Sequence, residues 1–394
     1  MTLNPTMFSR DDARHYYATL FPAESVFCLL EHSSRPTHPP SNREFGIETL
    51  DGKFRRWKSC SSPADLRRLL VSSETGKLNI GAVYETSVSN RFKRDRGGEY
   101  TPMNDVGAEL KFDIDLDDYT HLGTAKHDLD SCDSAWPVLA LGLEVLKRLL
   151  EINFGFKKFL AVYSGRRGAH LWVFDRRAFG LSNEARSSIV AWLQPQPSNW
   201  FNNAGNAPYL ASVDIVTREL VLPFFETKGI IDADEGGLGL LDAPPQRQRF
   251  VDKLGIEQSV INDIRGTTPA QFLRIVLRHV MQKRHTILQY EAAVWDLVCP
   301  RLDANVTKDR RHTLKSVFSL HPSTGRLSVP IFGPLGDFDP KRDAISIAKL
   351  LSSKKTVAKL SETICSFQTF VARTGDEDVV DRSTPPLKPP AFYD

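Results

Sequence analysis

Two aspartates that alternate with apolar residues are the first feature of this sequence that could do chemistry. Asp113 and Asp115 lie within the run ELKFDIDLDDY. Alternate side chains of a strand point to the same face, so this pattern predicts one buried face made by Phe112, Ile114 and Leu116 and one face that carries both carboxylates. Carboxylates this close repel each other, and a hard divalent cation such as Mg²⁺ would relieve the repulsion. A half-buried strand with a solvated acidic face is the alternative.

A second candidate is the short turn SGRRG at residues 164–168, which separates two apolar runs. Its glycines permit a tight backbone, and the paired guanidiniums of Arg166 and Arg167 offer bidentate donors to phosphate oxygens. Ser164 and His170 could donate to the same anion. The pattern therefore favours a triphosphate-binding turn over a connecting hairpin with solvated arginines.

A third cluster lies in the run PRLDANVTKDRRHTLKSVFSLHPSTGRLSVP, residues 300–330. It contains one isolated carboxylate, Asp303. The basic side chains after it are Lys308, Arg310, Arg311, His312, Lys315 and His321. Such a mixture suits a site that holds a metal ion and the phosphates that it bridges. Taken alone, a basic surface loop explains this run better.

The run KFRRWKS is a further basic element, close in sequence to Glu44. If it is a regular strand, Arg56 and Trp57 point to opposite faces. One face of the run would then pack in the core, and the other would line a basic groove.

The bulk composition indicates a globular intracellular protein of about two domains. The chain has 394 residues, of which 41% are hydrophobic and 25% charged. With a net charge of +3, binding to a polyanion must depend on local clusters. Five scattered cysteines without a CxxC pair are typical of reduced thiols, and no run has membrane-spanning length.

Local patterns predict an α/β (α+β) fold with a mixed-sheet core and an inserted, mostly helical subdomain. The expected helices are two short ones split at Phe21-Pro22 and those over 62–72, 139–152, 246–264, 270–298, 341–353 and 356–373. The expected strands are a hairpin around Asp51-Gly52 and runs over 78–85, 109–119, 158–164, 169–175 and 325–332. The predicted divisions are 1–178 and 299–374 for the core, 179–298 for the helical subdomain and 375–394 for a disordered tail.

In this order and with these flanks, the clusters closely resemble the catalytic small subunit of archaeal and eukaryotic DNA primase, in the archaeo-eukaryotic primase superfamily. The resemblance covers most of residues 15–332. Its other matching stretches are HYYATLFP, REFGIET, FRRW, NIGAVYE and FGFKKFLAVYSGRRGAHLWVFD. It implies the mixed α/β primase core with a helical insertion. It also implies a nucleotidyltransferase that makes short RNA primers from ribonucleoside triphosphates on single-stranded DNA during replication, by a two-metal mechanism.

The resemblance also implies roles for single residues. Asp113, Asp115 and Asp303 would be the catalytic carboxylates that hold Mg²⁺ or Mn²⁺. The residues that would bind nucleotide are Glu44, Arg56, Ser164, Arg166, Arg167, His170, Lys315 and His321.

The protein partners that the resemblance implies are a DNA primase large subunit and a replicative polymerase of the polymerase alpha type. Its ligands would be a single-stranded DNA template, an RNA primer and ribonucleoside triphosphates, and no membrane contact is expected. The location would be nuclear in a eukaryote and otherwise cytoplasmic. The alternatives are a stand-alone primase-polymerase of repair or damage bypass, and an inactive nucleic-acid-binding scaffold subunit.

Two departures from the family pattern alter the expectations. The family usually carries a zinc knuckle after the acidic strand, but Ala135 stands at its last cysteine position. Cys132, His121 and His127 leave three ligands at best, whereas structural zinc takes four, so we expect no tightly bound zinc. Asn79 stands where relatives often place an acid, which predicts a weaker contact to the sugar hydroxyls and weaker discrimination between ribo- and deoxyribonucleotides.

Overall fold

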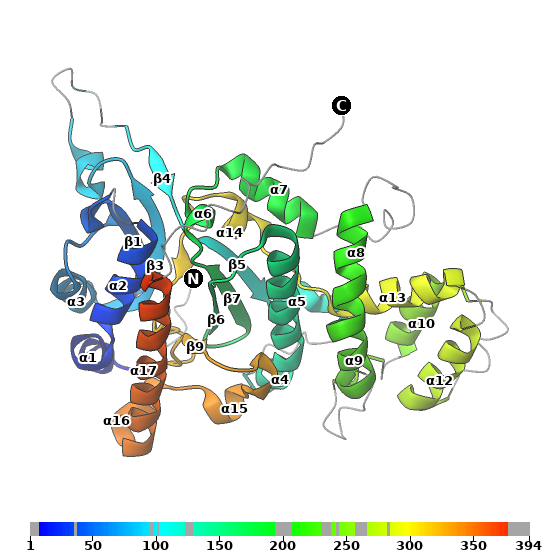
Figure 1. Cartoon of the computed structure of the whole chain (residues 1–394). Helices are drawn as coiled ribbons and strands as arrows, with labels where there is room; N and C mark the ends of the chain where they lie inside the picture. The colour runs from blue at the N-terminus through cyan, green and yellow to red at the C-terminus, as the bar shows by residue number, and fades with distance from the viewer. Residues whose placement is uncertain are drawn as a thin grey trace. The chain divides into compact units, whose positions relative to one another are not determined.

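Helices and sheets alternate along the chain in a mixed α/β fold, as predicted (Figure 1). The computed structural model describes residues 8–34, 38–94, 98, 100, 102–122, 129–193, 207–229, 238–241, 244–256, 266–281 and 284–376. Internal contacts divide the chain into two units. The first comprises residues 1–113, 156–191 and 303–394, and the second comprises 114–155 and 192–302.

The first unit begins with helices that are interrupted at a proline. α1 (Arg10–His15) continues into the π-helical turn η1 (Tyr16–Leu20), and α2 (Ala23–Ser34) follows Pro22. Phe21 has an extended backbone (φ −66°, ψ 126°). This confirms the predicted break, because proline disfavours a helical residue before it.

One sheet of this unit has the strand order β2-β1-β3-β4, with β8 also paired to β3, and its pairings are antiparallel. Its strands are β1 (Arg43–Thr49), β2 (Phe54–Lys58), β3 (Thr75–Tyr84), β4 (Asp105–Gly107) and β8 (Leu314–Lys315). The intervening helices are η2 (Pro40–Asn42), α3 (Pro63–Ser72) and η3 (Val88–Phe92). The predicted hairpin is confirmed, and Gly52 supplies its left-handed residue (φ 79°).

The other sheet has the order β5-β7-β6-β9. Its strands are β5 (Leu110–Asp115), β6 (Phe159–Tyr163), β7 (Gly168–Val173) and β9 (Val329–Ile331). The helices that follow these strands are α6 (Arg176–Phe179), α7 (Asn183–Leu193), α14 (Ala304–Lys308), η10 (Leu335–Asp337), α15 (Pro340–Asp343), α16 (Ile347–Ser352) and α17 (Lys354–Asp376). Both strands that flank the predicted turn at 164–168 are therefore present.

The prediction of one continuous helix over 341–353 was wrong. The chain instead forms α15 and α16, separated by an extended Ala344 (φ −63°, ψ 132°). The carbonyl of Ile345 accepts a hydrogen bond from the amide of Leu327 at 2.8 Å, and Ser346 caps α16. Pairing with a distant segment thus competes with helix formation here.

The second unit is helical in its described part. Its elements are η4 (Leu116–Leu122), α4 (Leu129–Ser134), α5 (Trp136–Phe154), α8 (Ala207–Val216), η7 (Thr217–Val221), α9 (Leu222–Phe224), η8 (Phe225–Gly229), α10 (Pro244–Leu254), α12 (Pro269–Val280) and α13 (Arg284–Val298). α5 ends at Phe154, close to the predicted end at residue 152, and Gly155, which the sequence also offers as a stop, follows with a left-handed φ of 62°.

Two helix predictions in this unit need correction. The helix expected over 246–264 ends at Leu254, because Gly255 turns left-handed (φ 59°). The helical stretch expected over 270–298 is divided between α12 and α13. Residues 257–265, 282–283 and the tail from 377 lie outside the described residues.

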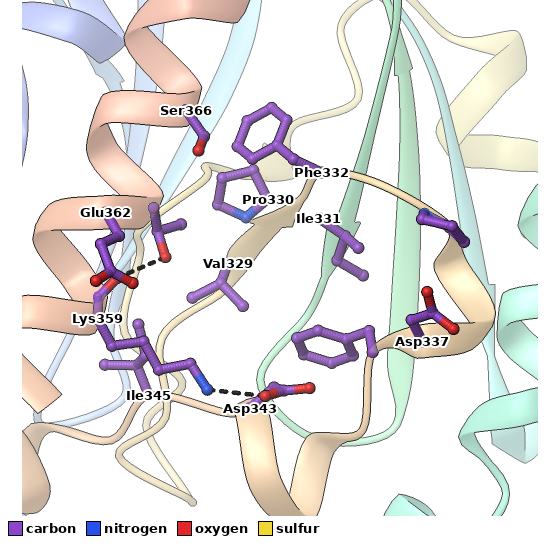
Figure 2. Close-up of a pocket in the computed structure, with 13 residues that line it drawn as sticks. Val329, Pro330, Ile331, Phe332, Asp337, Asp343, Ile345, Lys359, Glu362 and Ser366 are labelled. Carbon is purple, nitrogen blue, oxygen red and sulfur yellow. Dashed lines mark hydrogen bonds and ion pairs between the residues drawn. The ribbon is translucent and has the colours of Figure 1, made fainter.

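A pocket of about 340 Å³ lies among β9, α15 and α17 (Figure 2). Its walls include Val329, Ile331 and Ile345, and Lys359 Nζ donates to Asp343 Oδ1 at 2.9 Å across it. None of the residues predicted to do chemistry lines this pocket. Within the described residues, no helix is long and apolar enough to cross a membrane.

Candidate active site

The acidic strand β5 has the two faces that its alternation predicted. Phe112 and Ile114 are fully buried and Leu116 is nearly so, whereas Asp113 and Asp115 are half-buried. The backbone therefore separates the apolar side chains from the carboxylates, as in any strand with one buried face.

Asp303 lies beside this strand despite its distance in sequence. Its backbone amide donates to the carbonyl oxygen of Asp113 at 3.0 Å. The pairing of two backbone segments thus brings a second predicted metal ligand next to the first.

The side chains of the other two aspartates accept hydrogen bonds from nearby amides. Asp115 Oδ1 accepts from Asp117 N, and Asp303 Oδ1 accepts from Asn305 N as the N-cap of α14, both at 3.0 Å. Carboxylate oxygens are the donors that hard divalent ions prefer, so the chemistry of the predicted ligands fits such an ion. Across the part of the chain that is described, no three Asp, Glu, His or Cys side chains converge as a metal site. Their metal role stays a prediction.

The turn between β6 and β7 closes on itself through Ser164. The amide of Ser164 donates to the carbonyl of Gly168 at 2.9 Å, and Gly168 N donates to the Ser164 hydroxyl at 3.1 Å. Gly165 has a φ of 98°, and a Cβ there would lie 3.0 Å from the Cβ of His321. Glycine is therefore required both for the backbone conformation and for the close approach of the His321 segment.

Lys315 and His170 connect this turn with the acidic strand. Lys315 lies on β8, is buried, and donates to the carbonyl oxygen of Ser164. His170 is buried on β7, with Nε2 at 3.6 Å from Asp113 Oδ1. Lys315 thus joins β8 to the turn, and His170 places β7 beside Asp113.

Both histidines have lowered pKa values, mainly because they are buried and secondly because cations lie nearby. Burial, followed by Lys315 and Lys77, lowers the pKa of His170 well below its usual value. The same causes, with Arg166 and Arg167, lower the pKa of His321 to about 2. Both imidazoles are therefore neutral near pH 7, and the cations around them favour an anion.

Glu44 and Arg56 form an ion pair at the neighbouring strands β1 and β2. Arg56 Nε and Nη2 donate to the two oxygens of Glu44 at 2.8 and 3.0 Å, and Glu44 is fully buried. Arg56 also donates to the carbonyl of Arg311 at 2.8 Å. Glu44 therefore orients Arg56, and a contact of either residue with nucleotide stays a prediction.

Comparison with known proteins decides the family. The family model of the DNA primase small subunit matches residues 112–332, which is more than half of the chain. The chain belongs to the DNA primase small subunit family. Membership implies nucleotidyl transfer that makes RNA primers, the use of divalent metal, and a large subunit as partner.

Individual relatives match over most of their length. The chain is 27% identical to the DNA primase small subunit of Saccharomyces cerevisiae over 388 residues, which covers 92% of this chain and 91% of the relative. It is 30% identical to that of Caenorhabditis elegans over 353 residues, 82% of each chain. The archaeal DNA primase small subunit PriS of Archaeoglobus fulgidus is 24% identical over 330 residues, 83% of each chain.

Two cations of the basic run after Asp303 form ion pairs with a carboxylate of the protein itself. Arg310 and Arg311 both pair with Asp105 on β4, at 2.7 and 2.6 Å. The sequence predicted a nucleotide contact for neither arginine, and the alternative of a basic surface loop does not predict their pairing with Asp105. Asp105 is nearly buried, so its charge needs partners.

Lys77 is a cation to which the sequence analysis assigned no role, and it forms an ion pair with Glu48. It lies on β3, two residues before Asn79, and its charge lowers the pKa of both histidines. Asn79 pairs with Lys315 across the sheet, and within the described residues its buried Nδ2 has no hydrogen-bond partner. The alternation of Lys77 with Asn79 along β3 was the signal that could have revealed it.

The zinc prediction is not tested by the described residues. Cys132 is buried in α4, and Ala135 is the N-cap of α5. The side chain of His121 and all of His127 lie outside the described part of the chain.

Proposed function

We propose that this chain assembles short RNA primers from ribonucleoside triphosphates on a single-stranded DNA template during replication. The proposal is carried by the position of Asp113 between the Asp303 backbone and the His170 side chain. This juxtaposition supports a site in which carboxylates and phosphate-binding groups act on the same nucleotide.

In this proposal Asp113, Asp115 and Asp303 hold Mg²⁺ or Mn²⁺. When bound, such ions activate the attacking 3′-hydroxyl and neutralise the leaving pyrophosphate. The protein contributes position and charge, and no side chain forms a covalent intermediate.

The triphosphate binds at the turn between β6 and β7. Its ligands are Ser164, Arg166, Arg167, His170, Lys315 and His321. The arginines supply bidentate donors, and the neutral histidines supply one N–H each. Glu44 holds Arg56 for a contact with the nucleotide.

The decisive experiment removes the carboxylates of β5. Asp113→Ala with Asp115→Ala is expected to abolish primer synthesis on a poly-pyrimidine template with Mg²⁺ or Mn²⁺, while circular dichroism stays unchanged. Asp117→Ala with Asp118→Ala is the matched control, because both side chains are exposed and have no assigned role. Activity that survives in the first variant would overturn the assignment.

The proposed assembly is a large subunit joined to a replicative polymerase of the polymerase alpha type, in the nucleus if the source is eukaryotic and otherwise in the cytoplasm. Primer synthesis with ribo- and deoxyribonucleotides offered separately, with and without a co-expressed large subunit, distinguishes it from a stand-alone primase-polymerase. A preference for deoxyribonucleotides without the large subunit would favour the latter.

A further inference from the structure

Two guanidinium groups lie against the indole ring of Trp57. Arg56 Cζ lies 5.2 Å and Arg91 Cζ 4.3 Å from the ring centroid, while the ring of Tyr84 packs against it at 5.5 Å. Arg91 comes from η3, which is remote from β2 in sequence, and is exposed. Both distances are within the range of a cation–π interaction, so the indole orders both arginines.

The backbone of Trp57 makes this arrangement possible. Its φ of 63° is left-handed, which is strained for a large side chain. A regular strand would place Arg56 and Trp57 on opposite faces, as the sequence predicted, but here the guanidinium lies over the neighbouring ring. Trp57 N donates to Glu44 Oε1 at 3.2 Å, which ties the strained residue to the active site.

A second pair of the same kind lies farther along the chain. Arg94 Cζ is 4.7 Å from the ring centroid of Tyr100, and Arg94 Nη2 donates to the Tyr100 hydroxyl at 3.3 Å. Tyr100 is 58% exposed. Within the described residues, neither Arg91 nor Arg94 forms an ion pair with a carboxylate, unlike Arg310 and Arg311.

We propose that Trp57, Arg91, Arg94 and Tyr100, the cation–aromatic ridge, bind the single-stranded DNA template. Guanidiniums bind phosphates, and aromatic rings offer a surface on which any base stacks, so such a ridge binds without regard to sequence. That is what copying an arbitrary template requires. The ridge joins the active site through Arg56, which contacts Glu44 and the carbonyl of Arg311. The inference rests on the proposed function, because it assumes a DNA template.

The test uses the full chain with its large subunit and a fluorescent oligothymidylate. For Arg91→Ala with Arg94→Ala we expect the Kd to rise about tenfold and the slope of log Kd against log salt to fall by about 1.4, about 0.7 for each lost phosphate contact. The KM for template should rise, whereas kcat and the KM for ribonucleotide stay unchanged. Tyr100→Ala, at an exposed site, should weaken binding without reducing the salt slope.

The matched control is Arg10→Ala with Arg67→Ala, which removes the same charge from arginines paired with Glu74 and Glu24. This control should leave the Kd and the salt slope unchanged. An unchanged Kd and slope in the ridge variants overturns the proposal. The proposal is also overturned if the ridge variants lose binding to the large subunit, or to an RNA oligonucleotide, while their binding to DNA is intact. If wild type makes no primer on DNA, the proposed function itself fails, which is a separate outcome.

Discussion

Positive charge has two different environments in the first unit. Arg43, Arg186 and Lys111 are almost completely buried, and carbonyl or carboxylate oxygens accept from them. In contrast, Arg91 and Arg94 are exposed and rest on aromatic rings. The first group is held by the fold, whereas the second is accessible to a ligand.

The buried cations are tolerated because most of their donors have acceptors, the exception among the described residues being Arg43 Nε. Arg43 makes a bidentate pair with Glu109, with both distances 2.7 Å, and Arg186 donates to the backbone carbonyls of Ala108 and Glu109. Lys111 donates to the carbonyl of His312. Burial, and then the charge of Arg186, lower the pKa of Lys111 to about 7.

This buried group supports the acidic strand. Lys111 lies on β5 two residues before Asp113, so the two share a face. Its backbone carbonyl accepts from the hydroxyl of Thr307, in the helix that follows Asp303. All of these side chains are basic, and their exposure to solvent distinguishes them. The buried ones hold the strands of the site in place, whereas the exposed ones can contact a ligand.

The largest expected effect comes from breaking the buried pair. Arg43→Met removes the bidentate partner of the buried Glu109 carboxylate, which should lower the free energy of unfolding by about 3–5 kcal/mol. Urea denaturation measures it. Arg43→Met with Glu109→Met should recover most of the loss, and a single variant as stable as wild type would show that the buried group is not structural.

Removing the cations of the turn should affect substrate binding more than stability. Arg166→Ala with Arg167→Ala should raise the KM for ribonucleotide about 100-fold or more, because each of the two arginines loses a charge-assisted hydrogen bond of about 1.5–3 kcal/mol. Steady-state kinetics with saturating template measures the KM, and the melting temperature is the control. An unchanged KM would contradict the phosphate-binding role.

A smaller effect is expected from Lys111→Met. The change removes the desolvation cost of a buried ammonium but leaves the His312 carbonyl without this donor, and these effects oppose each other. We expect the free energy of unfolding to change by less than about 1 kcal/mol in urea. A loss as large as that for Arg43→Met would mean that an unpaired lysine and an ion-paired arginine contribute equally.

The smallest effect should come from an exposed ion pair. Arg10 and Glu74 lie 3.2 Å apart, with side chains 67% and 52% exposed. Arg10→Ala should change the free energy of unfolding by less than about 0.5 kcal/mol, because water and salt screen such pairs. Thermal unfolding at low and high salt checks this. A decrease of the free energy of unfolding by more than about 1 kcal/mol would contradict the expected difference between exposed and buried ion pairs.

Local pattern was enough to predict much of the fold. The break at Phe21-Pro22, the hairpin at Gly52 and the end of α5 before Gly155 were all predicted, because each depends on the backbone preferences of a few neighbouring residues. Helix continuity was harder to predict. The gap between α15 and α16 depends on the pairing of Ile345 with Leu327, which no local window contains.

The sequence by itself determined the chemistry of the candidate site: alternating aspartates on one strand and a Gly-Arg-Arg-Gly turn between two others. Only the tertiary structure decided which cations share that site. It paired Lys77 with Glu48 and Arg310 with Asp105, and it placed Arg91 against Trp57. Periodicity assigns a residue to a face of its own strand, whereas strand pairing and burial decide which distant residue it meets.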